Sequence, residues 1–325
     1  MIDITIFTPT YNRAHTLEKL YMSLKRQTMH NFQWLIIDDG STDTTEETIH
    51  QFMAEGALSI RYVKQPNAGK HAAMNRGALM AEGKWFFIVD SDDYLTDNAV
   101  ERISAYCGQI ENNPSFAGIV GLRGKNQSEP WKAWYGETDN TDEGLRRGPS
   151  TYGTAEAKRQ TPGQNEYVDA TCIEYRYRLG NQGDRAEVIR TSVLRQYPFP
   201  QFEKENFLVE GYLWLTLAKA GYRFRWFQEI IYITEYLSDG LTRNIRRHYL
   251  NNPKGSCAFY NLQMSCKGIP WKVQIRAAAN YFRYGFHGKY TFFVLFKKMR
   301  KKAMLPVGMV IGCMLALKDC RNKEI

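Results

Sequence analysis

The chain has 325 residues, of which 43% are hydrophobic and 24% are charged, and its formal net charge is +9. This length and composition are ordinary for a globular protein with one large domain or two. The six cysteines are scattered without a CxxC pair, which argues against a zinc site or a disulfide framework and favours a reducing, cytosolic setting. The first residues have the pattern of a strand, so we expect no secretory signal.

The positive charge is concentrated at one end of the chain. Residues 241–325 contain 17 Lys and Arg against two acids, a balance of +15, whereas residues 1–240 carry a balance of −6. We therefore divide the chain into an acidic body, residues 1–240, and a basic, aromatic-rich helical extension, residues 241–325. The extension needs its own explanation, because net charge informs about partners rather than about fold.

Strand and helix patterns alternate over the first 95 residues. Short apolar runs predict strands, and apolar residues three to four positions apart predict helices. The predicted strands are 4–8, 32–37, 59–63 and 85–89, and the predicted helices are 16–27, 43–53 and 69–81. This order predicts an α/β fold with a mostly parallel sheet flanked by helices, in which ligands bind beyond the carboxyl ends of the strands.

Polar, turn-forming residues follow each of the four predicted strands. They are 9–13 (PTYNR), 38–43 (DDGSTD), 65–70 (QPNAGK) and 90–93 (DSDD). One such segment could be a plain turn, but four at the same edge of a sheet indicate a binding site. The chain has neither a dinucleotide-binding glycine motif nor a P-loop, so a metal and cationic side chains must hold any nucleotide phosphates.

Three carboxylates lie close together after the most apolar strand. Asp90, Asp92 and Asp93 would repel one another without a cation between them. A hard divalent cation, Mg²⁺ or Mn²⁺, suits such oxygen ligands and keeps positions open for substrate phosphates. Helix capping is the alternative for single members such as Asp93. For the cluster as a whole we favour the metal.

Four segments carry a resemblance to a known family. Residues 8–13 (TPTYNR), 36–43 (IIDDGSTD), 67–77 (NAGKHAAMNRG) and 89–93 (VDSDD) resemble, in order and spacing, the family 2 glycosyltransferases of the GT-A fold. The resemblance covers the N-terminal part of the chain. It implies an inverting transferase that uses a divalent metal and a nucleotide diphosphate sugar, with a UDP-sugar favoured.

The resemblance also implies roles for single residues. Tyr11 would stack on the base, and Asp39 would accept a hydrogen bond from the imide N–H of the base. Asp90, in a segment similar to the family's Asp-x-Asp motif, would contact the ribose, and Asp92 would bind the metal. Lys70 would lie near the phosphates, although a solvated lysine at a helix start is an equal alternative. The remaining candidates for nucleotide-sugar binding are Pro9, Arg13 and Ser91.

The patterns after residue 96 are less regular. Residues 100–110 predict a helix and 117–122 a strand, whereas residues 121–164 predict a mobile loop near the acceptor. Periodicity returns at 184–195, which we interpret as a helix. Residues 224–234 predict a strand pair that closes the core.

Glu210 is the candidate general base. Residues 202–218 predict a largely buried helix with Glu210 in its first turn, a place where an acid also suits the helix dipole. In the family that the chain resembles, an acid at the start of this helix acts as the base, commonly within a Glu-Asp pair. Here the pair reads Glu210-Gly211. Among the acids after the variable loop, only Glu210 opens an apolar helix, whereas the others lie in polar loops or fit a helix start: Asp184, Glu187, Glu203 and Glu205.

The extension combines a basic segment with an apolar one. Residues 297–302 (KKMRKK) precede an apolar run, 303–317, that contains Pro306 and two glycines. A membrane-spanning helix needs roughly 20 apolar residues, so this run is short. We favour contact with an anionic membrane surface. The alternative is a helix packed on the body.

The sequence thus predicts a cytoplasmic glycosyltransferase, peripheral on the inner face of the cell membrane. It would transfer a sugar to a carbohydrate or lipid-linked glycan in polysaccharide or lipid-linked oligosaccharide assembly. A non-catalytic sugar-nucleotide-binding protein is the alternative for the body. Nucleic-acid binding is the alternative for the basic extension, but we expect no nucleic-acid partner because the acidic motifs repel phosphate.

Overall fold

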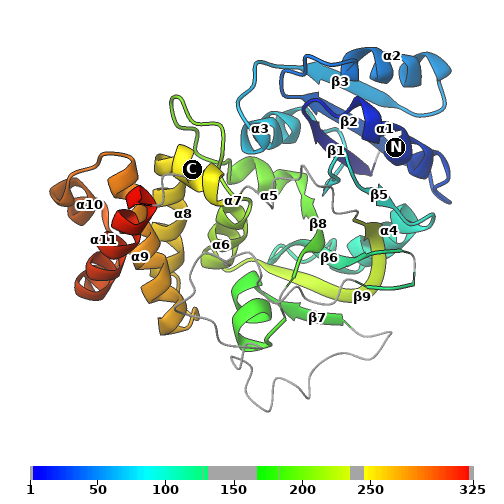
Figure 1. The fold of residues 1–325 in the computed structure, drawn as a ribbon. Coiled ribbons are helices and arrows are strands. Elements are labelled where there is room, and N and C mark those ends of the chain that lie inside the picture. Colours follow the sequence, from blue (N-terminus) through cyan, green and yellow to red (C-terminus); the bar gives the residue numbers. More distant parts are fainter. Residues whose placement is uncertain (1–2, 127, 131–166, 182, 235–244, 322–325) are drawn as a thin grey trace.

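The computed structural model describes residues 3–126, 128–130, 167–181, 183–234 and 245–321. Its centre is a mixed sheet of order β3-β2-β1-β4-β8-β6-β9-β5, with β7 paired to β9 (Figure 1). The strands are β1 (Ile4–Thr10), β2 (Phe32–Asp38), β3 (Ile60–Lys64), β4 (Trp85–Ile88), β5 (Tyr94–Leu95), β6 (Phe116–Gly124), β7 (Tyr167–Ala170), β8 (Arg185–Arg190) and β9 (Arg223–Ile233). The α-helices are α1 (Ala14–Lys25), α2 (Thr45–Glu55), α3 (Lys70–Met80), α4 (Ala99–Ile110), α5 (Thr191–Gln196), α6 (Gly211–Lys219), α7 (Ile245–Asn251), α8 (Pro253–Ser265), α9 (Trp271–His287), α10 (Phe292–Lys298) and α11 (Leu305–Arg321).

The first four strands form the parallel half of the sheet, and the prediction for residues 1–95 is confirmed. β1 pairs in parallel with β2 and β4, and β2 pairs in parallel with β3. Helices α1, α2 and α3 make the crossovers between these strands. The carboxyl ends of the four strands therefore lie at one edge, and the loops that follow them share that edge.

Two apolar layers hold the helices on the sheet. On β1, Ile4 and Ile6 pack in the layer under α1, α2 and α4, and Phe7 packs in the layer under α3, α5 and α6. Side chains alternate between the faces of a strand, so one strand serves both layers. Burying a large apolar side chain is worth about 1.5–3 kcal/mol, and these layers are the main source of stability.

The predicted helix at residues 184–195 is wrong. These residues form β8, which lies between β4 and β6 and is antiparallel to both, followed by the short α5. Ala186 and Val188 join one apolar layer and Ile189 joins the other. A central strand carries apolar residues on both faces, and their spacing in so short a segment is hard to distinguish from that of a helix.

Three further predictions need adjustment. β9 is one long strand that pairs with β5, β6 and β7, where the sequence predicts a strand pair. Glu210 is the N-cap of α6 rather than a member of its first turn. Residues 121–124 of the predicted loop belong to β6, whereas residues 131–166 and the predicted domain boundary at 240 lie outside the described residues.

Helices α7 to α11 extend from one end of the molecule (Figure 1). α8 packs on α6, where Leu262 meets Leu215, and α9 packs between α8 and α11. Pro306 lies in the first turn of α11, where its missing N–H costs no hydrogen bond. The apolar run that the sequence shows as interrupted is therefore one continuous helix.

Asp319 ties α11 to its neighbours. Its carboxylate, 1% exposed, accepts hydrogen bonds from Arg283 Nε and Nη2 (both 2.7 Å) and pairs with His287 Nε2 (3.0 Å) and with Arg246. Burial alone would raise the pKa of Asp319, but Arg283 above all, together with Arg246 and the hydrogen bond to His287, lowers it to about 2. The charged network therefore stabilises the fold at neutral pH.

We expect Asp319→Asn to lower the free energy of unfolding at neutral pH by about 3–5 kcal/mol, since it leaves buried cations unpaired. The folded pKa lies below the unfolded one, so the contribution is complete above about pH 4 and is lost as the pH falls towards 2. Urea unfolding of the two proteins over this range should show the difference shrinking. A constant difference would contradict this role for the Asp319 charge.

Candidate active site

Asn12 joins the loops after β1 and β2. Its backbone N–H donates to Ser41 Oγ (2.8 Å), and its Oδ1 accepts from the N–H of Thr42 (2.8 Å). The candidate residues Tyr11 and Arg13 flank Asn12, and the Tyr11 side chain is 49% exposed. An aromatic ring is thus available to a ligand at the edge where the sequence predicts base stacking.

Asp39 joins the loop after β2 to the loop after β3. Its Oδ1 accepts from Gln65 Nε2 (2.7 Å) and from the N–H of Ala68 (2.9 Å), and its Oδ2 accepts from the N–H of Gly69 (2.7 Å). A carboxylate has about four acceptor positions, so about one is left for a ligand N–H. Only glycine suits position 69, where φ is +89° and a Cβ would lie 1.7 Å from the carbonyl oxygen of Asn206.

Lys70 connects the strand ends to α6. This first residue of α3 pairs through Nζ with Asp90, after β4, and with Glu210 Oε1 (2.6 Å), at the start of α6. Burial disfavours the charged amine, but the two carboxylates raise the pKa of Lys70. The structure therefore brings a donor-side candidate, Asp90, and the base candidate, Glu210, to the same ammonium group.

The acidic cluster is held in place by two residues from the far half of the sheet. Tyr232 OH donates to Asp93 Oδ2 (2.7 Å) and accepts from the N–H of Asp90 (2.9 Å). Arg123 Nη1 lies 3.6 Å from Asp93 Oδ2 and 3.9 Å from Asp90 Oδ2. The Arg123 guanidinium lies over the Tyr232 ring, 4.2 Å from its centroid. Asp90 and Asp93 thus have cationic or hydroxyl partners within the protein.

The electrostatic environment of Asp92 differs from that of Asp90. Burial, and then the charge of Asp90, raises the pKa of Asp92. The same two causes raise the pKa of Asp93 to about 7. For Asp90 burial also opposes the charge, but Lys70 and Arg123 lower the pKa of this group. A cation beside Asp92 would relieve the remaining repulsion.

The chemistry of this donor set fits a hard divalent cation. Carboxylate oxygens are the ligands that Mg²⁺ and Mn²⁺ prefer, and Asp92 is half-buried with its charge only partly offset by Arg13 and Lys70. In the part of the chain that the structure describes, no group of three or more His, Cys, Asp or Glu side chains is arranged to hold a metal ion. Asp92 would therefore supply a protein ligand, and phosphate oxygens of a substrate would supply others.

Arg123 and Tyr232 are not among the candidate residues that the sequence indicates. Arg123 lies near the end of β6, where its Nε also donates to the carbonyl of Arg185 (2.8 Å), and Tyr232 lies on β9. One feature of the sequence could have identified Arg123: it is an arginine between two glycines at the end of an apolar strand, in residues 121–124. For Tyr232 the sequence offers no such signal. The other candidates, Pro9 at the end of β1 and Ser91 within the acidic segment, lie at the predicted edge.

Glu187 is a further carboxylate near the site. It lies on β8 opposite Val120 and interacts electrostatically with Arg123 and Glu210. Burial raises the pKa of Glu187 to about 7, and Arg123 opposes this rise. In the sequence Glu187 fits a helix start, whereas β8 brings it towards the other acids.

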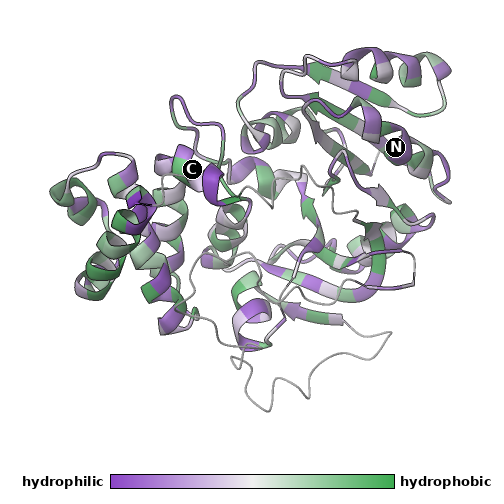
Figure 2. Ribbon diagram, in the orientation of Figure 1, coloured by the Kyte–Doolittle hydropathy of each residue, from purple (hydrophilic) through white to green (hydrophobic). Residues whose placement is uncertain are grey.

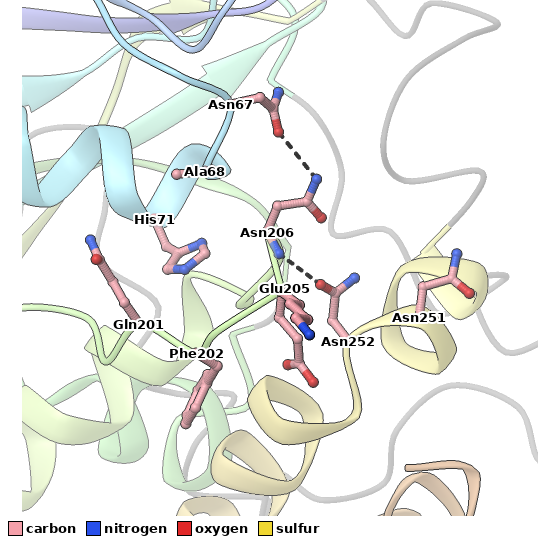
Figure 3. A pocket seen from close by; sticks show the side chains of 10 residues that line it. Asn67, Ala68, His71, Gln201, Phe202, Glu205, Asn206, Asn251 and Asn252 are labelled. Carbon is pink, nitrogen blue, oxygen red and sulfur yellow. Dashed lines mark hydrogen bonds between the residues drawn. The ribbon is translucent and has the colours of Figure 1, made fainter.

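A polar cavity of about 570 Å³ lies beside the start of α3 (Figure 3). Asn206 connects two parts of the cavity wall. Its side-chain Nδ2 donates to Asn67 Oδ1 (3.2 Å), and its backbone N–H donates to Asn252 Oδ1 (2.9 Å). The acids of the cluster and Glu210 lie outside this cavity. The lining residues are Asn67, Ala68, His71, Gln201, Phe202, Lys204, Glu205, Asn206, Asn251 and Asn252.

Residues 5–176 match the family model described as glycosyl transferase family 2. The match spans more than half of the chain and contains all four segments at the carboxyl edge of the sheet. The chain therefore belongs to glycosyl transferase family 2, and the resemblance seen in the sequence is confirmed.

Individual relatives match shorter segments. Glycosyltransferase GlyA of Streptococcus pneumoniae is 37% identical over 100 residues, which are 31% of this chain and 14% of GlyA. Poly(ribitol-phosphate) β-N-acetylglucosaminyltransferase TarP of Staphylococcus aureus is 29% identical over 132 residues, 40% of each protein. The chain thus matches less than half the length of these relatives.

Solved structures show the same fold. The structure of Staphylococcus aureus TarS 1–349 matches with a TM-score of 0.55 at 16% identity, over 95% of this chain and 78% of that one. Mannosyltransferase PcManGT from Pyrobaculum calidifontis matches with a TM-score of 0.55 at 15% identity, over 99% and 88% of the two chains. The predicted GT-A fold is therefore confirmed.

Proposed function

We propose that this protein is a metal-dependent, inverting glycosyltransferase that moves a sugar from a nucleotide diphosphate sugar to an acceptor hydroxyl. One observation carries the proposal: Lys70 pairs with both Asp90 and Glu210. The pairing joins a donor-side carboxylate to a candidate base at the carboxyl ends of parallel strands, where such sheets bind ligands. Membership of the family supports the reaction type.

On the donor side, Tyr11 stacks on the base and Asp39 accepts the imide N–H through its remaining acceptor position. Asp90 contacts the ribose, Lys70 the phosphates, and Asp92 the metal. The remaining contacts come from Pro9, Arg13 and Ser91. Two matching structures hold UDP-GlcNAc in one case, and GDP-Man with Mn²⁺ in the other, which supports a nucleotide sugar and a divalent metal here. We favour a UDP-sugar.

On the acceptor side, Glu210 takes the proton of the acceptor hydroxyl as its oxygen attacks the anomeric carbon. The nucleoside diphosphate leaves from the opposite face. Lys70 holds Glu210 in the ligand-free site, and donor phosphates compete for the same ammonium group. Donor binding would thus free Glu210 to act as the base. Asp92 would hold a divalent metal, which would supply charge neutralisation for the leaving diphosphate.

The proposal includes the acceptor and its place in the cell. The name of TarP specifies a poly(ribitol-phosphate) acceptor for that relative, which supports a polymeric glycan or a lipid-linked glycan as the acceptor here. The basic residues beside the apolar helix α11 support a place at an anionic membrane surface. We therefore propose a cytoplasmic enzyme of polysaccharide biosynthesis that is peripheral on that face.

A thermal-shift screen of nucleotide sugars with and without Mn²⁺ tests the donor. A ligand that binds the folded state raises the melting temperature, by an amount equivalent to about 2.7 kcal/mol at 100 times its Kd. We expect a UDP-sugar with Mn²⁺ to give the largest shift. Release of UDP that depends on an added acceptor then identifies transfer. A shift without turnover would instead identify a non-catalytic sugar-nucleotide-binding protein.

We expect Asp39→Asn to weaken UDP binding by about 10- to 100-fold, because hydrogen bonds to a charged group are worth about 1.5–3 kcal/mol. The dependence of binding on Mn²⁺ should remain. Titration calorimetry with UDP measures both. Asp97→Asn is the control, since Asp97 pairs with Arg26 on the surface. Unchanged UDP affinity in the Asp39 variant would contradict its role in base recognition.

A further inference from the structure

The helices at the end of the molecule leave apolar side chains uncovered. α11 exposes Val307, Val310, Met314 and Leu317, which are 47–65% exposed. Their spacing of three and four residues places them on one side of the helix. α10 exposes Phe293, at 79%. Figure 2 shows that both helices are largely hydrophobic and lie at the end of the molecule farthest from β1 to β3.

Basic side chains border this apolar side. Lys297, Lys298, Arg300 and Lys302 are exposed in α10 and in the connection to α11. Asn261 of α8 fixes the connection, because its Nδ2 donates to the carbonyl of Lys298 (2.9 Å) and its Oδ1 accepts from the N–H of Arg300 (2.8 Å). The connection that carries Lys298 and Arg300 is thus fixed to α8 at the point where it leads into α11.

The surface of this region is complementary to an anionic partner. Between residues 245 and 321, the described part of the extension, Asp319 is the only acid, and it is buried among cations. A protein partner with an acidic, polar face would leave the apolar side chains uncovered. An anionic lipid surface offers both negative headgroups and an apolar interior.

Length and composition would also allow α11 to cross a membrane, since residues 302–321 form a helix long and apolar enough to do so. The packing argues against it. A Cβ on Gly308 would lie 2.6 Å from the Cβ of Ala278, and one on Gly312 would lie 2.6 Å from the Cβ of Phe282. α11 therefore lies directly against the backbone of α9, with no room for lipid between them.

The Asp319 network holds α11 in the same place. Moving α11 into a bilayer would separate the buried carboxylate of Asp319 from Arg283 and His287 of α9. α9 cannot follow α11 into hydrocarbon, because it also carries Lys272 and Arg276. Only the outer side of α11 is available to a membrane.

We infer that α10 and α11 dock on an anionic bilayer with α11 lying along its surface. The docking surface consists of Phe293, Val307, Val310, Met314 and Leu317, with the basic residues 297–302. The apolar side chains enter the interface, and the lysines bind anionic headgroups. This inference deepens the peripheral location in the proposed function, since it names the surface and its orientation.

Flotation of the full-length protein with lipid vesicles tests the inference. We expect binding to phosphatidylcholine vesicles that contain phosphatidylglycerol, weak binding to phosphatidylcholine alone, and release by high salt or alkaline carbonate. Lys297→Gln/Lys298→Gln/Lys302→Gln should lower the partition coefficient roughly 100-fold, at about fivefold per lysine. Val310→Ser/Met314→Ser/Leu317→Ser should lower it by about 100-fold or more. Leu79→Ser, at a residue 73% exposed on α3, is the control and should bind normally.

Three outcomes would overturn the inference. Absence of binding to the anionic vesicles rejects the lipid partner. Binding that survives carbonate extraction shows a helix that crosses the bilayer. Loss of a dimer in the serine variant, without vesicle binding by the native chain, assigns the surface to a second copy. All substitutions are at exposed positions, and unchanged melting temperatures verify folding. Vesicle binding uses neither donor nor acceptor, so its failure is distinguishable from failure of the transferase proposal.

Discussion

Asp92→Asn is expected to abolish sugar transfer. An amide has nearly the shape of a carboxylate but lacks the charge that holds a hard cation. Lys70 and Arg123 form ion pairs with Asp90 and Asp93, whereas Asp92 is half-buried and its pKa is raised by burial and by the charge of Asp90, so Asp92 is the member of the cluster that we expect to bind the cation. Loss of the cation removes several kcal/mol of stabilisation from the leaving diphosphate, so turnover should fall by ~10³-fold or more.

The measurement is UDP release during a titration with Mn²⁺, together with the Mn²⁺-dependent shift in melting temperature. We expect the native chain to show both effects and the Asp92 variant to show neither. Asp97→Asn, a surface substitution, should behave as the native chain. Full activity of the Asp92 variant after metal removal with EDTA would reject the metal hypothesis.

Glu210→Gln is expected to lower turnover by ~10²- to 10⁴-fold, the usual contribution of a general base, without loss of donor affinity. Glutamine keeps the size of the side chain but cannot take a proton from the acceptor. Single-turnover kinetics with a saturating donor isolates this step, and titration with UDP verifies the donor site. Loss of donor affinity in parallel with turnover would instead show that Glu210 acts by holding Lys70.

Two other glutamates serve as comparisons. Glu205 accepts hydrogen bonds from the N–H groups of Lys254 and Gly255 (both 2.8 Å) at the start of α8, so Glu205→Gln should lower stability and leave turnover unchanged. Glu187 is the stronger rival, because burial raises its pKa to about 7. If Glu187→Gln loses turnover and Glu210→Gln does not, β8 rather than α6 provides the base.

Local patterns suffice for the parallel half of the molecule. Each strand from β1 to β4 is a short apolar run followed by turn residues, and the crossover rule places their ends at one edge. The positions of Tyr11, Asp39 and Asp90 follow from this rule without knowledge of any contact. The pairing of Lys70 with Glu210 does not, since the two residues are 140 positions apart in the chain.

The second half of the sheet depends on interactions that are not local. β8 enters the sheet between β4 and β6, and its sequence has the apolar spacing of a helix as well as that of a strand. Arg123 and Tyr232 gain their roles only when β6 and β9 meet. The same limit applies to α11, where Pro306 and two glycines resemble interruptions until the position of α9 is known.

The hydrogen bonds of Asp39 affect which positions of the neighbouring loop tolerate mutation. Asp39 binds the main-chain N–H groups of Ala68 and Gly69, so the side chain of Ala68 takes no part in these hydrogen bonds, whereas the side chain of Asn67 accepts one from Asn206. Mutations at position 68 can therefore alter the surface of this loop while its hydrogen bonds to Asp39 remain. A saturation library at position 68 is a direct way to search for altered nucleotide preference in this scaffold.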